Sequence, residues 1–336
     1  MPEIATTDYH TAGEPFRIVT AGVPQIPGAT VRERREAARA DPAVDHVRLL
    51  LCHEPRGHAD MYGCFLVPPD DAGADLGVLF WHKDGYSTAC GHGTIALGAW
   101  AVRSGVVAAE PDGETTVTVD VPSGRVVARV ACRGGEVQSV SFVNVPSYVL
   151  ARGIEVGTSF GAVRADVAYG GAIYASVRAG DLGLAVTPEH YPALIAAGRE
   201  VKAALADSPA ARHPADERLS GIYGTILHED LGAGPDGPRQ RNVTVFADGE
   251  VDRSPCGSGT SARVALLADA GELAEGQALL HESIVGTRFT GRLVGRVGAD
   301  GRDAVLTEVQ GTAFPTGEHR FVLDPRDPLG TGFVLR

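Results

Sequence analysis

The sequence predicts an α/β protein made of two similar domains. The first observation is length, because 336 residues exceed one ordinary domain and fit two. The second is an internal repeat: the motif Cys-Gly-x-Gly-Thr-x-Ala occurs at Cys90 and again at Cys256, 166 residues apart. The third is context, since a predicted strand precedes each copy and an apolar stretch with helical character follows it. We therefore expect a duplication that brings two helix N-termini to one cleft.

Composition restricts the class of partner. The chain is 44% hydrophobic and 21% charged, which is typical of a globular protein. Its net charge of −12, without a basic cluster, argues against nucleic acid or an anionic membrane surface as a partner. No apolar run approaches the roughly 18 residues of a membrane-spanning helix. We expect neither nucleic acid nor a membrane to be bound.

The cysteines and the N-terminus predict the compartment. Five cysteines, an odd number, are spread widely and form no Cys-x-x-Cys pair; they stand at positions 52, 64, 90, 132 and 256. The first residues lack the basic and apolar regions of a secretory signal. We therefore expect reduced thiols in a cytoplasmic protein rather than a disulfide framework.

Apolar runs and turn residues predict the elements of the first half. Residues 8–15 are expected to form a polar loop that leads into a short strand at 17–20. An exposed helix is expected at 30–40 and a buried strand at 46–52. The remaining elements are a polar loop at 54–61, strands at 76–82 and 137–145, a helix at 95–102, and a hairpin of 115–121 with 125–130.

The second half is predicted to begin after a domain crossing at 146–155, where strand signals resume. The expected elements are strands at 162–167, 170–177, 242–246, 291–297 and 305–311, a helix at 188–205, and loops at 206–217 and 232–239. We place the first domain, with Cys90, at residues 1–148 and expect a C-terminal strand at about 320–336 to join it. The second domain, with Cys256, is placed at 149–319.

A cysteine at a helix start has a particular chemistry. The free backbone N–H groups there point at the sulfur and at any anion beside it. We therefore expect Cys90 to have a lowered pKa and to be partly thiolate near neutral pH. The glycines that follow, Gly91 and Gly257, would let a carboxylate come close to the backbone.

Other uses of the repeated motif fit less well. Cys90 and His92 offer two zinc ligands, but no second pair at short spacing is present. The glycine turns lack the spacing of a dinucleotide or phosphate loop. The only lysines, Lys83 and Lys202, lie outside any phosphate-binding turn, which disfavours pyridoxal phosphate. A cysteine hydrolase would need one thiol rather than two equivalent ones. We expect no cofactor and no metal.

Two thiols that face each other across a cleft suit the inversion of a stereocentre. One, as thiolate, removes a proton from one face of a carbon, and the other, as thiol, returns a proton to the opposite face. The helix N-termini would hold the substrate carboxylate and stabilise the negative charge that develops. Asp252, four residues before Cys256, can pair with a substrate ammonium or imino nitrogen.

Over nearly its whole length the chain resembles the proline racemase superfamily. The resemblance is carried by the segments Asp8-x-His10-Thr11-x-Gly13-Glu14-Pro15, Glu54-Pro55-Arg56-Gly57-His58-x-Asp60-Met61, Cys90-Gly91-His92-Gly93-Thr94 and Asp252-Arg253-Ser254-Pro255-Cys256-Gly257-Ser258-Gly259-Thr260. It implies a fold like that of diaminopimelate epimerase: two pseudo-symmetric α/β domains, each a curved sheet around a central helix, with the site between them.

The resemblance also implies residue roles. Cys90 and Cys256 match the cysteines that act as acid and base. The expected substrate-binding positions are Gly91, His92, Asp252, Gly257, Ser258 and Thr260, with His228 as a further pocket position that no motif anchors. The expected partner is a small imino acid, proline or hydroxyproline, and the chain is a candidate homodimer.

The superfamily includes proline racemases, 4-hydroxyproline 2-epimerases and trans-3-hydroxyproline dehydratases. The resemblance implies that the dehydratases typically carry threonine in place of the second cysteine, so Cys256 favours a racemase or epimerase. Three other segments resemble the dehydratases instead: Gly85-Tyr86-Ser87-Thr88 before Cys90, His58-Ala59-Asp60-Met61-Tyr62-Gly63, and the Gly332-Phe333 tail. We rank a two-thiol racemase or epimerase first, a dehydratase that forms a cyclic imine second, and a catalytically silent imino-acid binder third.

Overall fold

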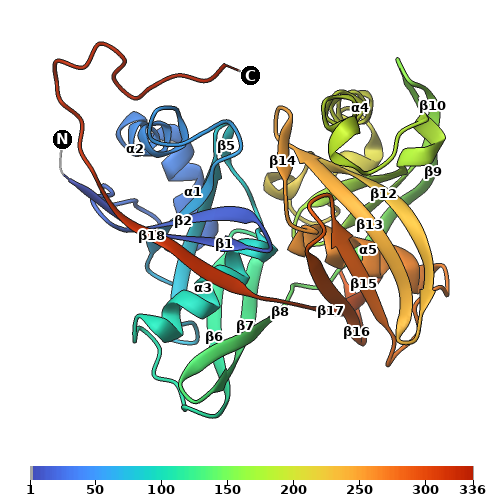
Figure 1. Cartoon of the computed structure of the whole chain (residues 1–336), viewed down its shortest axis with the longest axis horizontal. Coiled ribbons are helices and arrows are strands. Elements are labelled where there is room, and N and C mark those ends of the chain that lie inside the picture. Colours follow the sequence, from blue (N-terminus) through green and yellow to red (C-terminus); the bar gives the residue numbers. More distant parts are fainter. Residues whose placement is uncertain (1–2, 336) are drawn as a thin grey trace.

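The computed structural model describes residues 3–335 and shows two α/β lobes side by side (Figure 1). The first lobe contains β1 (Ile4–Thr11), β2 (Glu14–Ala21), α1 (Val31–Ala40), α2 (Pro42–Cys52), β3 (Tyr62–Val67), β4 (Leu76–His82), β5 (Gly85–Tyr86), α3 (Gly91–Arg103), β6 (Gly113–Val121), β7 (Gly124–Arg133), β8 (Glu136–Val143) and β18 (Ala313–Phe321). The second contains β9 (Tyr148–Thr158), β10 (Gly161–Tyr169), β11 (Ile173–Arg178), α4 (Tyr191–Ala204), β12 (Ile222–Gly234), β13 (Gly237–Phe246), β14 (Glu250–Asp252), α5 (Gly257–Asp269), β15 (Ala278–Ser283), β16 (Arg288–Ala299) and β17 (Arg302–Gly311).

The two lobes have matching strand topologies. In the first lobe, β1 is antiparallel to β2, β2 parallel to β3, β3 antiparallel to β4, and β4 parallel to β6. In the second lobe, β10, β11, β12, β13 and β15 follow each other in the same antiparallel and parallel order. Each series ends in an antiparallel meander, β6–β7–β8 or β15–β16–β17. This match confirms the predicted pair of pseudo-symmetric curved sheets.

One strand lies at the outer edge of each lobe, and a further strand pair joins the two lobes. β9 pairs with β10, and β18 pairs with β1 at the equivalent edge of the first lobe. The chain therefore returns to the first lobe at Ala313, earlier than the strand predicted at about 320–336, and residues 313–319 do not belong with the second lobe. β8 pairs with β17, so the strands of both lobes form one continuous sheet. The predicted crossing at 146–155 is largely the strand β9, because the link between β8 and β9 is short.

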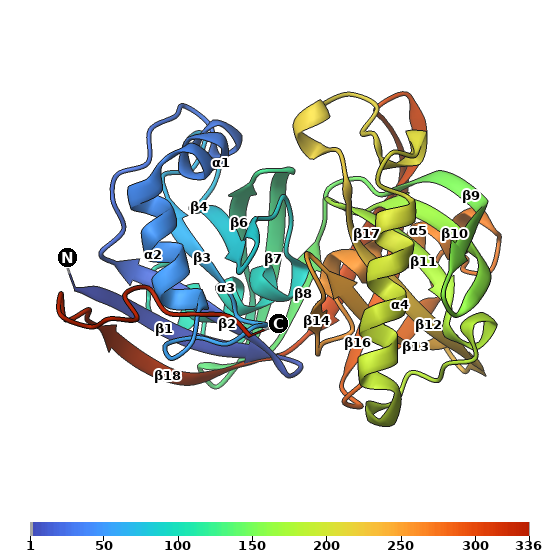
Figure 2. The ribbon, with the colours of Figure 1, turned by 90° about the horizontal axis from the view of Figure 1, so that it is seen from above.

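A central helix lies inside the curve of each sheet, and the other face is covered by α1 and α2 in the first lobe and by α4 in the second (Figure 2). α3 is buried from Gly91 to Ala101, and α5 is buried from Gly257 to Ala268. Most residues on all sides of these helices are small or apolar, which allows this burial, with His92 and Arg263 as buried polar exceptions. Their shared position in the two lobes sets both repeated motifs at equivalent places.

The strand predicted at 46–52 is wrong, because these residues belong to α2. Asp41 caps this helix through a hydrogen bond from Ala43 N to its side chain, and Pro42 occupies the first helical position. The buried residues Val44, Val47 and Leu51 follow helical spacing. The short apolar run alone does not distinguish a strand from a helix, whereas the capping signals do.

Most other predicted elements agree with the structure. The hairpin is β6–β7, and the helices predicted at 30–40 and 188–205 correspond to α1 and α4. The predicted polar loop at 8–15 is wrong, since its residues extend β1 and begin β2, and the predicted loop at 232–239 is mostly a continuation of β12 and β13. None of the helices within residues 3–335 has the length and hydropathy that a bilayer crossing requires.

Candidate active site

The two repeated motifs meet where α3 and α5 begin. A Cβ atom added to Gly91 would lie 2.6 Å from the Gly257 backbone, and one added to Gly257 would lie 2.6 Å from Gly91 Cα. Real Cβ atoms do not approach backbone this closely, so direct contact between the helix starts requires glycine at both positions. The expectation that these glycines make room for a carboxylate is therefore incomplete.

Cys90 is the N-cap of α3. Its Sγ accepts a hydrogen bond from Gly93 N at 3.2 Å, and it lies 3.5 Å from either ring nitrogen of His92. The His92 ring is held edge-on against Tyr62 and Phe16, at centroid distances of 5.0 and 5.8 Å. The aromatic contacts fix the imidazole beside the thiol.

Cys256 is the N-cap of α5, in the equivalent position. Its Sγ accepts a hydrogen bond from Gly259 N at 3.3 Å, and the Tyr174 hydroxyl lies 3.9 Å from the sulfur. The backbone of Cys256 has φ +63°, a conformation that residues other than glycine rarely adopt. Ser254 Oγ accepts a hydrogen bond from Cys256 N at 3.0 Å and so helps to hold it there.

The expected lowering of the Cys90 pKa is wrong for the protein without substrate. Burial raises the pKa of the Cys90 thiol well above its usual value, and the Gly93 N–H only partly opposes this. Burial likewise raises the pKa of Cys256. The negative charge of Asp252 raises both pKa values further. The effect of the helix N-termini, which lowers the thiol pKa, is therefore smaller than the effects of desolvation and of a neighbouring carboxylate, which raise it.

Asp252 is near enough to act electrostatically on both thiols and is itself ionised. Its Oδ1 accepts hydrogen bonds from Ser254 N at 2.8 Å and Ser254 Oγ at 2.7 Å, while Oδ2 lies 3.7 Å from His92 Nδ1. Burial opposes ionisation, but the nearby His92 imidazole and the Ser254 donors outweigh it, so the pKa of Asp252 is lowered. A buried anion beside both cysteines suits a cationic ring nitrogen.

The N–H groups of Gly91, His92, Gly257 and Ser258 occupy the first two positions of the two helices, where no intrahelical partner exists. Ser258 Oγ is paired with the Tyr174 hydroxyl at 2.7 Å. Thr260 differs: its Oγ1 contacts Pro255 O and His281 Nδ1, and its N–H bonds Cys256 O. Thr260 therefore holds the motif together and has no donor directed at a substrate.

His228 is not brought to the thiols. It lies on β12 and lines a separate cavity with Gln240 of β13 and Arg263 of α5. Its position follows from strand geometry, because Ile226 on the same face of β12 already reaches Gly259 at the start of α5. Two residues further along the strand, His228 faces the other end of the helix.

Sequence reasoning missed a group of tyrosines around the site. The Tyr62 hydroxyl lies 3.0 Å from the Tyr223 hydroxyl and 2.5 Å from Ser87 Oγ. The Tyr174 and Tyr223 rings meet edge-on at 5.7 Å. These residues come from β3, β11 and β12 of both lobes, so no local spacing connects them. Tyrosine on otherwise apolar strands was the only available signal.

Glu14 is a further buried acid near the site. Its Oε2 accepts a hydrogen bond from Arg253 N at 2.8 Å and pairs with Arg253 Nε at 3.0 Å. Burial raises the pKa of Glu14 well above its usual value, although Arg253 partly opposes this. Glu14 belongs to one of the segments that carry the family resemblance, but the sequence does not predict its partner. The ion pair joins β2 of one lobe to the second motif of the other.

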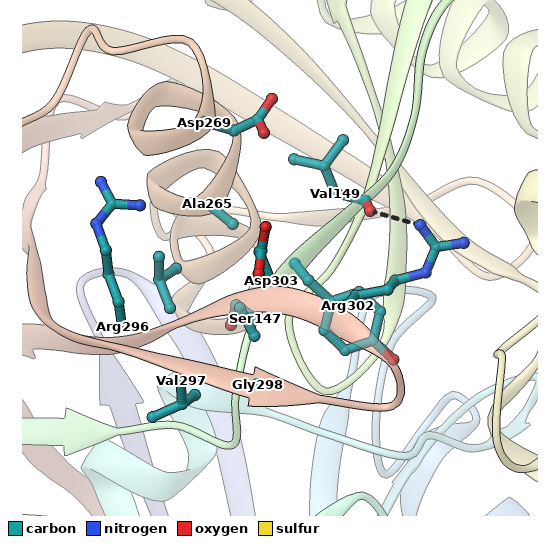
Figure 3. Close-up of a pocket in the computed structure, with 12 residues that line it drawn as sticks. Ser147, Val149, Ala265, Asp269, Arg296, Val297, Gly298, Arg302 and Asp303 are labelled. Carbon is teal, nitrogen blue, oxygen red and sulfur yellow. Dashed lines mark hydrogen bonds between the residues drawn. The ribbon is translucent and has the colours of Figure 1, made fainter.

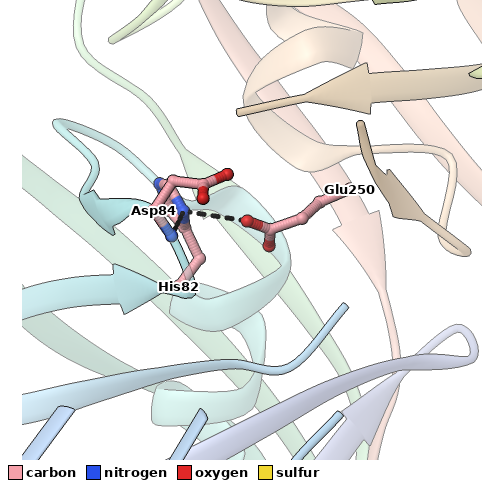
Figure 4. Close-up of side chains that lie close together, drawn as sticks. All are labelled: His82, Asp84 and Glu250. Atoms are coloured by element: carbon pink, nitrogen blue, oxygen red, sulfur yellow. Dashed lines mark hydrogen bonds and ion pairs between the residues drawn. The ribbon is translucent and has the colours of Figure 1, made fainter. Parts of the chain in front are cut away.

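His82, Asp84 and Glu250 are the side chains in the described part of the chain that are grouped closely enough to be considered for a metal (Figure 4). His82 Nδ1 lies 3.2 Å from Glu250 Oε1, which connects the two lobes. Lys83 Nζ lies 2.8 Å from Asp84 Oδ2 and 3.8 Å from Glu250 Oε1. An ammonium group therefore already balances these carboxylates, and the group is an interlobe contact.

A cavity of about 690 Å³ lies away from the thiols, between α5 and the β16–β17 hairpin (Figure 3). Asp269 and Arg296 border it, and Arg302 Nη1 donates to Val149 O at 3.3 Å. Cys90 and Cys256, by contrast, are only 4% and 5% exposed. The structure therefore shows the helix-start site closed.

The comparisons with known proteins agree with this geometry. The family model described as proline racemase matches residues 6–334. The chain belongs to the proline racemase family. A crystal structure described as a hydroxyproline epimerase from Agrobacterium vitis, with bound trans-4-hydroxy-L-proline, covers 100% of this chain and 95% of its own. It has 34% identity and a TM-score of 0.92.

Curated relatives divide between two activities. A trans-3-hydroxy-L-proline dehydratase from Bacillus thuringiensis is 44% identical over 98% of this chain and 97% of its own. A 3-hydroxyproline 2-epimerase from Burkholderia multivorans is 46% identical over 99% of this chain and 98% of its own. The family therefore includes isomerases and dehydratases, and membership alone does not select between them.

Proposed function

We propose that this protein is an epimerase that inverts Cα of a proline-type imino acid, with 3-hydroxyproline as the first substrate to test. The observation that carries the proposal is the equivalent placement of Cys90 and Cys256 at two helix N-caps in contact. The substrate class comes from the relatives named for 3-hydroxyproline, at 44–46% identity.

In this mechanism one thiolate removes the Cα proton, and the electron pair enters the adjacent carboxylate as an enediolate. The thiol on the other side donates its proton to the opposite face of Cα, so the product has inverted configuration and the two sulfurs have exchanged protonation states. The N–H groups of Gly91, His92, Gly257 and Ser258 would hold the carboxylate and its developing charge.

The substrate also changes the electrostatics of the thiols. Asp252 raises the pKa of both cysteines in the closed site. A cationic ring nitrogen placed against Asp252 would offset this negative charge and make ionisation of one thiol easier. The proposal therefore couples thiolate formation to substrate binding, while Asp252 itself stays ionised because its pKa is lowered.

Dehydration of trans-3-hydroxy-L-proline is the second candidate. It begins with the same removal of the Cα proton, after which the 3-hydroxyl leaves as water and a cyclic imine forms. The names of several relatives favour it. The hydroxyl pair of Tyr174 and Ser258 favours it as well, because the Tyr174 hydroxyl, a proton donor, lies 3.9 Å from Cys256 Sγ. Such a donor can protonate the leaving hydroxyl.

The experiment follows both products in parallel. We incubate the protein in D₂O with trans-3-hydroxy-L-proline, trans-4-hydroxy-L-proline and L-proline, and assay by chiral chromatography and imine detection. Epimerase activity gives inverted product with deuterium at Cα, and Cys256→Ser lowers its rate by at least about 100-fold. Imine formation without inverted product would replace the epimerase by the dehydratase. Substrate-dependent thermal stabilisation without either product would identify a silent binder.

A further inference from the structure

A second polar cavity lies behind the site, under the later turns of α5. Its volume is about 290 Å³, and it is lined by residues of β9–β13, of α5 and of the turns that follow β11 and α5. The sheet face there is continuous with the site: Ser176 pairs in register with Ile226, and Arg178 pairs with His228. Since Ile226 faces Gly259 of α5, this row of side chains faces the same helix.

Arg263 places a buried positive charge at this cavity. The residue is 5% exposed, and its Nε donates to Gln240 Oε1 at 3.1 Å. Within residues 3–335, no carboxylate oxygen lies within ion-pair distance of its guanidinium. Burial lowers its pKa only to about 10, so the group is charged at neutral pH. A buried charge with one neutral acceptor is energetically costly.

Two of the four carboxylates that border the cavity, Asp166 and Asp230, are held by other arginines, and Asp181 and Glu272 also border it. Asp230 Oδ2 lies 2.9 Å from Arg178 Nη2, and Asp166 Oδ2 lies 3.1 Å from Arg152 Nη1. Within the described chain, Arg263 has no carboxylate oxygen within ion-pair distance, although Asp166, Asp230 and Glu272 lie near enough to raise its pKa. A small anion in the cavity would give Arg263 the direct partner that these carboxylates do not provide.

Two further residues that line the cavity carry buried polar atoms without a hydrogen-bond partner in the described chain. Ser176 and His228 are 3% and 5% exposed, and both line it. Ser176 Oγ and His228 Nδ1 are buried and have no hydrogen-bond partner in the described chain. A buried polar atom without a partner is rare in folded proteins and marks a place where a bound group completes the structure.

We propose that this cavity is a binding site for a small oxyanion, either a carboxylate or inorganic phosphate. Arg263 supplies the charge, and the Ser176 hydroxyl and a His228 N–H supply hydrogen bonds from β11 and β12. Guanidinium is well suited to the planar oxygens of such groups. The site is separate from the proposed catalytic thiols and does not depend on which reaction they perform.

The test measures the unfolding temperature of the full-length protein in rising potassium phosphate or potassium acetate, with KCl keeping the ionic strength constant. We expect a saturable rise of about 2–4 °C with at least one anion. Arg263→Met should abolish the rise, whereas the control Arg296→Met, which changes an exposed arginine at another cavity, should keep it. A rise with phosphate alone assigns a phosphoryl ligand, and one with acetate alone assigns a carboxylate.

The helix N-termini of the catalytic site can also attract anions, so calorimetric titration of two more variants separates the sites. Ser176→Ala and His228→Leu leave the thiols and helix starts intact, and each should weaken anion binding about tenfold. These variants also keep the proposal testable if Arg263→Met does not fold. Unchanged affinity in both, or a wild-type rise no larger than that in KCl, overturns the proposal.

Discussion

One buried residue, Asp252, affects the pKa of both Cys90 and Cys256 and so affects their chemistry. Its charge raises the pKa of both thiols, yet its own pKa is lowered by His92 and Ser254 despite burial. The sequence alone indicated the residue types and their spacing in the motif. The direction of the thiol pKa could not be predicted from it, because desolvation depends on side chains from both lobes.

The lowered pKa of Asp252 has a consequence for stability. A carboxyl group whose folded-state pKa lies below its unfolded value of about 3.9 stabilises the protein above that value. This contribution is lost as the pH falls through the folded-state pKa. We therefore expect Asp252→Asn to lower the free energy of unfolding by about 1.5 kcal/mol at pH 7. The difference from wild type should shrink as the pH falls below about 4.

Urea unfolding at pH 7, 5 and 3.5 measures this difference. Asp324→Asn is a suitable control, since Asp324 also has a lowered pKa, through Arg326, but is fully exposed. Its effect should be much smaller because solvent screens the pair. An Asp252→Asn penalty that stays constant across this pH range would contradict the assigned ionisation.

At the scale of elements, the central helices were the most predictable part of the site. The repeated motif located both helix starts, because cysteine, glycine and the apolar stretch are adjacent in sequence. The tyrosines, Glu14 and the true surroundings of His228 were not predictable, since strand register and curvature bring them together across the lobes. The prediction of a strand at 46–52 failed because apolar periodicity does not distinguish a short strand from a helix.

The contact between the helix starts can be tested at Gly91. Alanine there would place a Cβ 2.6 Å from the Gly257 backbone, so one helix must shift. We expect Gly91→Ala to lower the free energy of unfolding by about 1–3 kcal/mol and to lower kcat by more than tenfold, because the thiols move apart. Thermal unfolding and the inversion assay provide both values.

Gly298→Ala is the matched control, because nothing lies within 4 Å of a Cβ added to Gly298 and its φ is not in the left-handed region. This variant should have wild-type stability and activity. Equal effects from both substitutions, or full activity in Gly91→Ala, would mean that the spacing between the helix starts is unimportant.

For the whole molecule, the closed site requires the lobes to move before a substrate can enter. The thiols are 4% and 5% exposed, and the hydrogen bond between His82 and Glu250 and the ion pair between Arg253 and Glu14 connect the lobes. Arg253 of the second lobe lies 3.0 Å from Glu14 Oε2 and 3.2 Å from Asp60 Oδ2, both in the first lobe. The continuous β8–β17 ladder holds the lobes while such pairs separate.

Removal of Arg253 should therefore favour the open form. We expect Arg253→Met to increase the rate at which iodoacetamide alkylates Cys90 and Cys256 by about tenfold or more. Peptide mass spectrometry measures the alkylation of each thiol over time. Cys52 and Cys64, which are fully buried in the core of the first lobe, report global unfolding in the same sample. Because loss of a buried ion-pair partner also destabilises the fold by about 3 kcal/mol, the ratio between the two pairs of thiols is the decisive quantity. Selective acceleration at Cys90 and Cys256 identifies lobe separation, whereas equal acceleration at all four thiols assigns the effect to unfolding and contradicts a gate at Arg253.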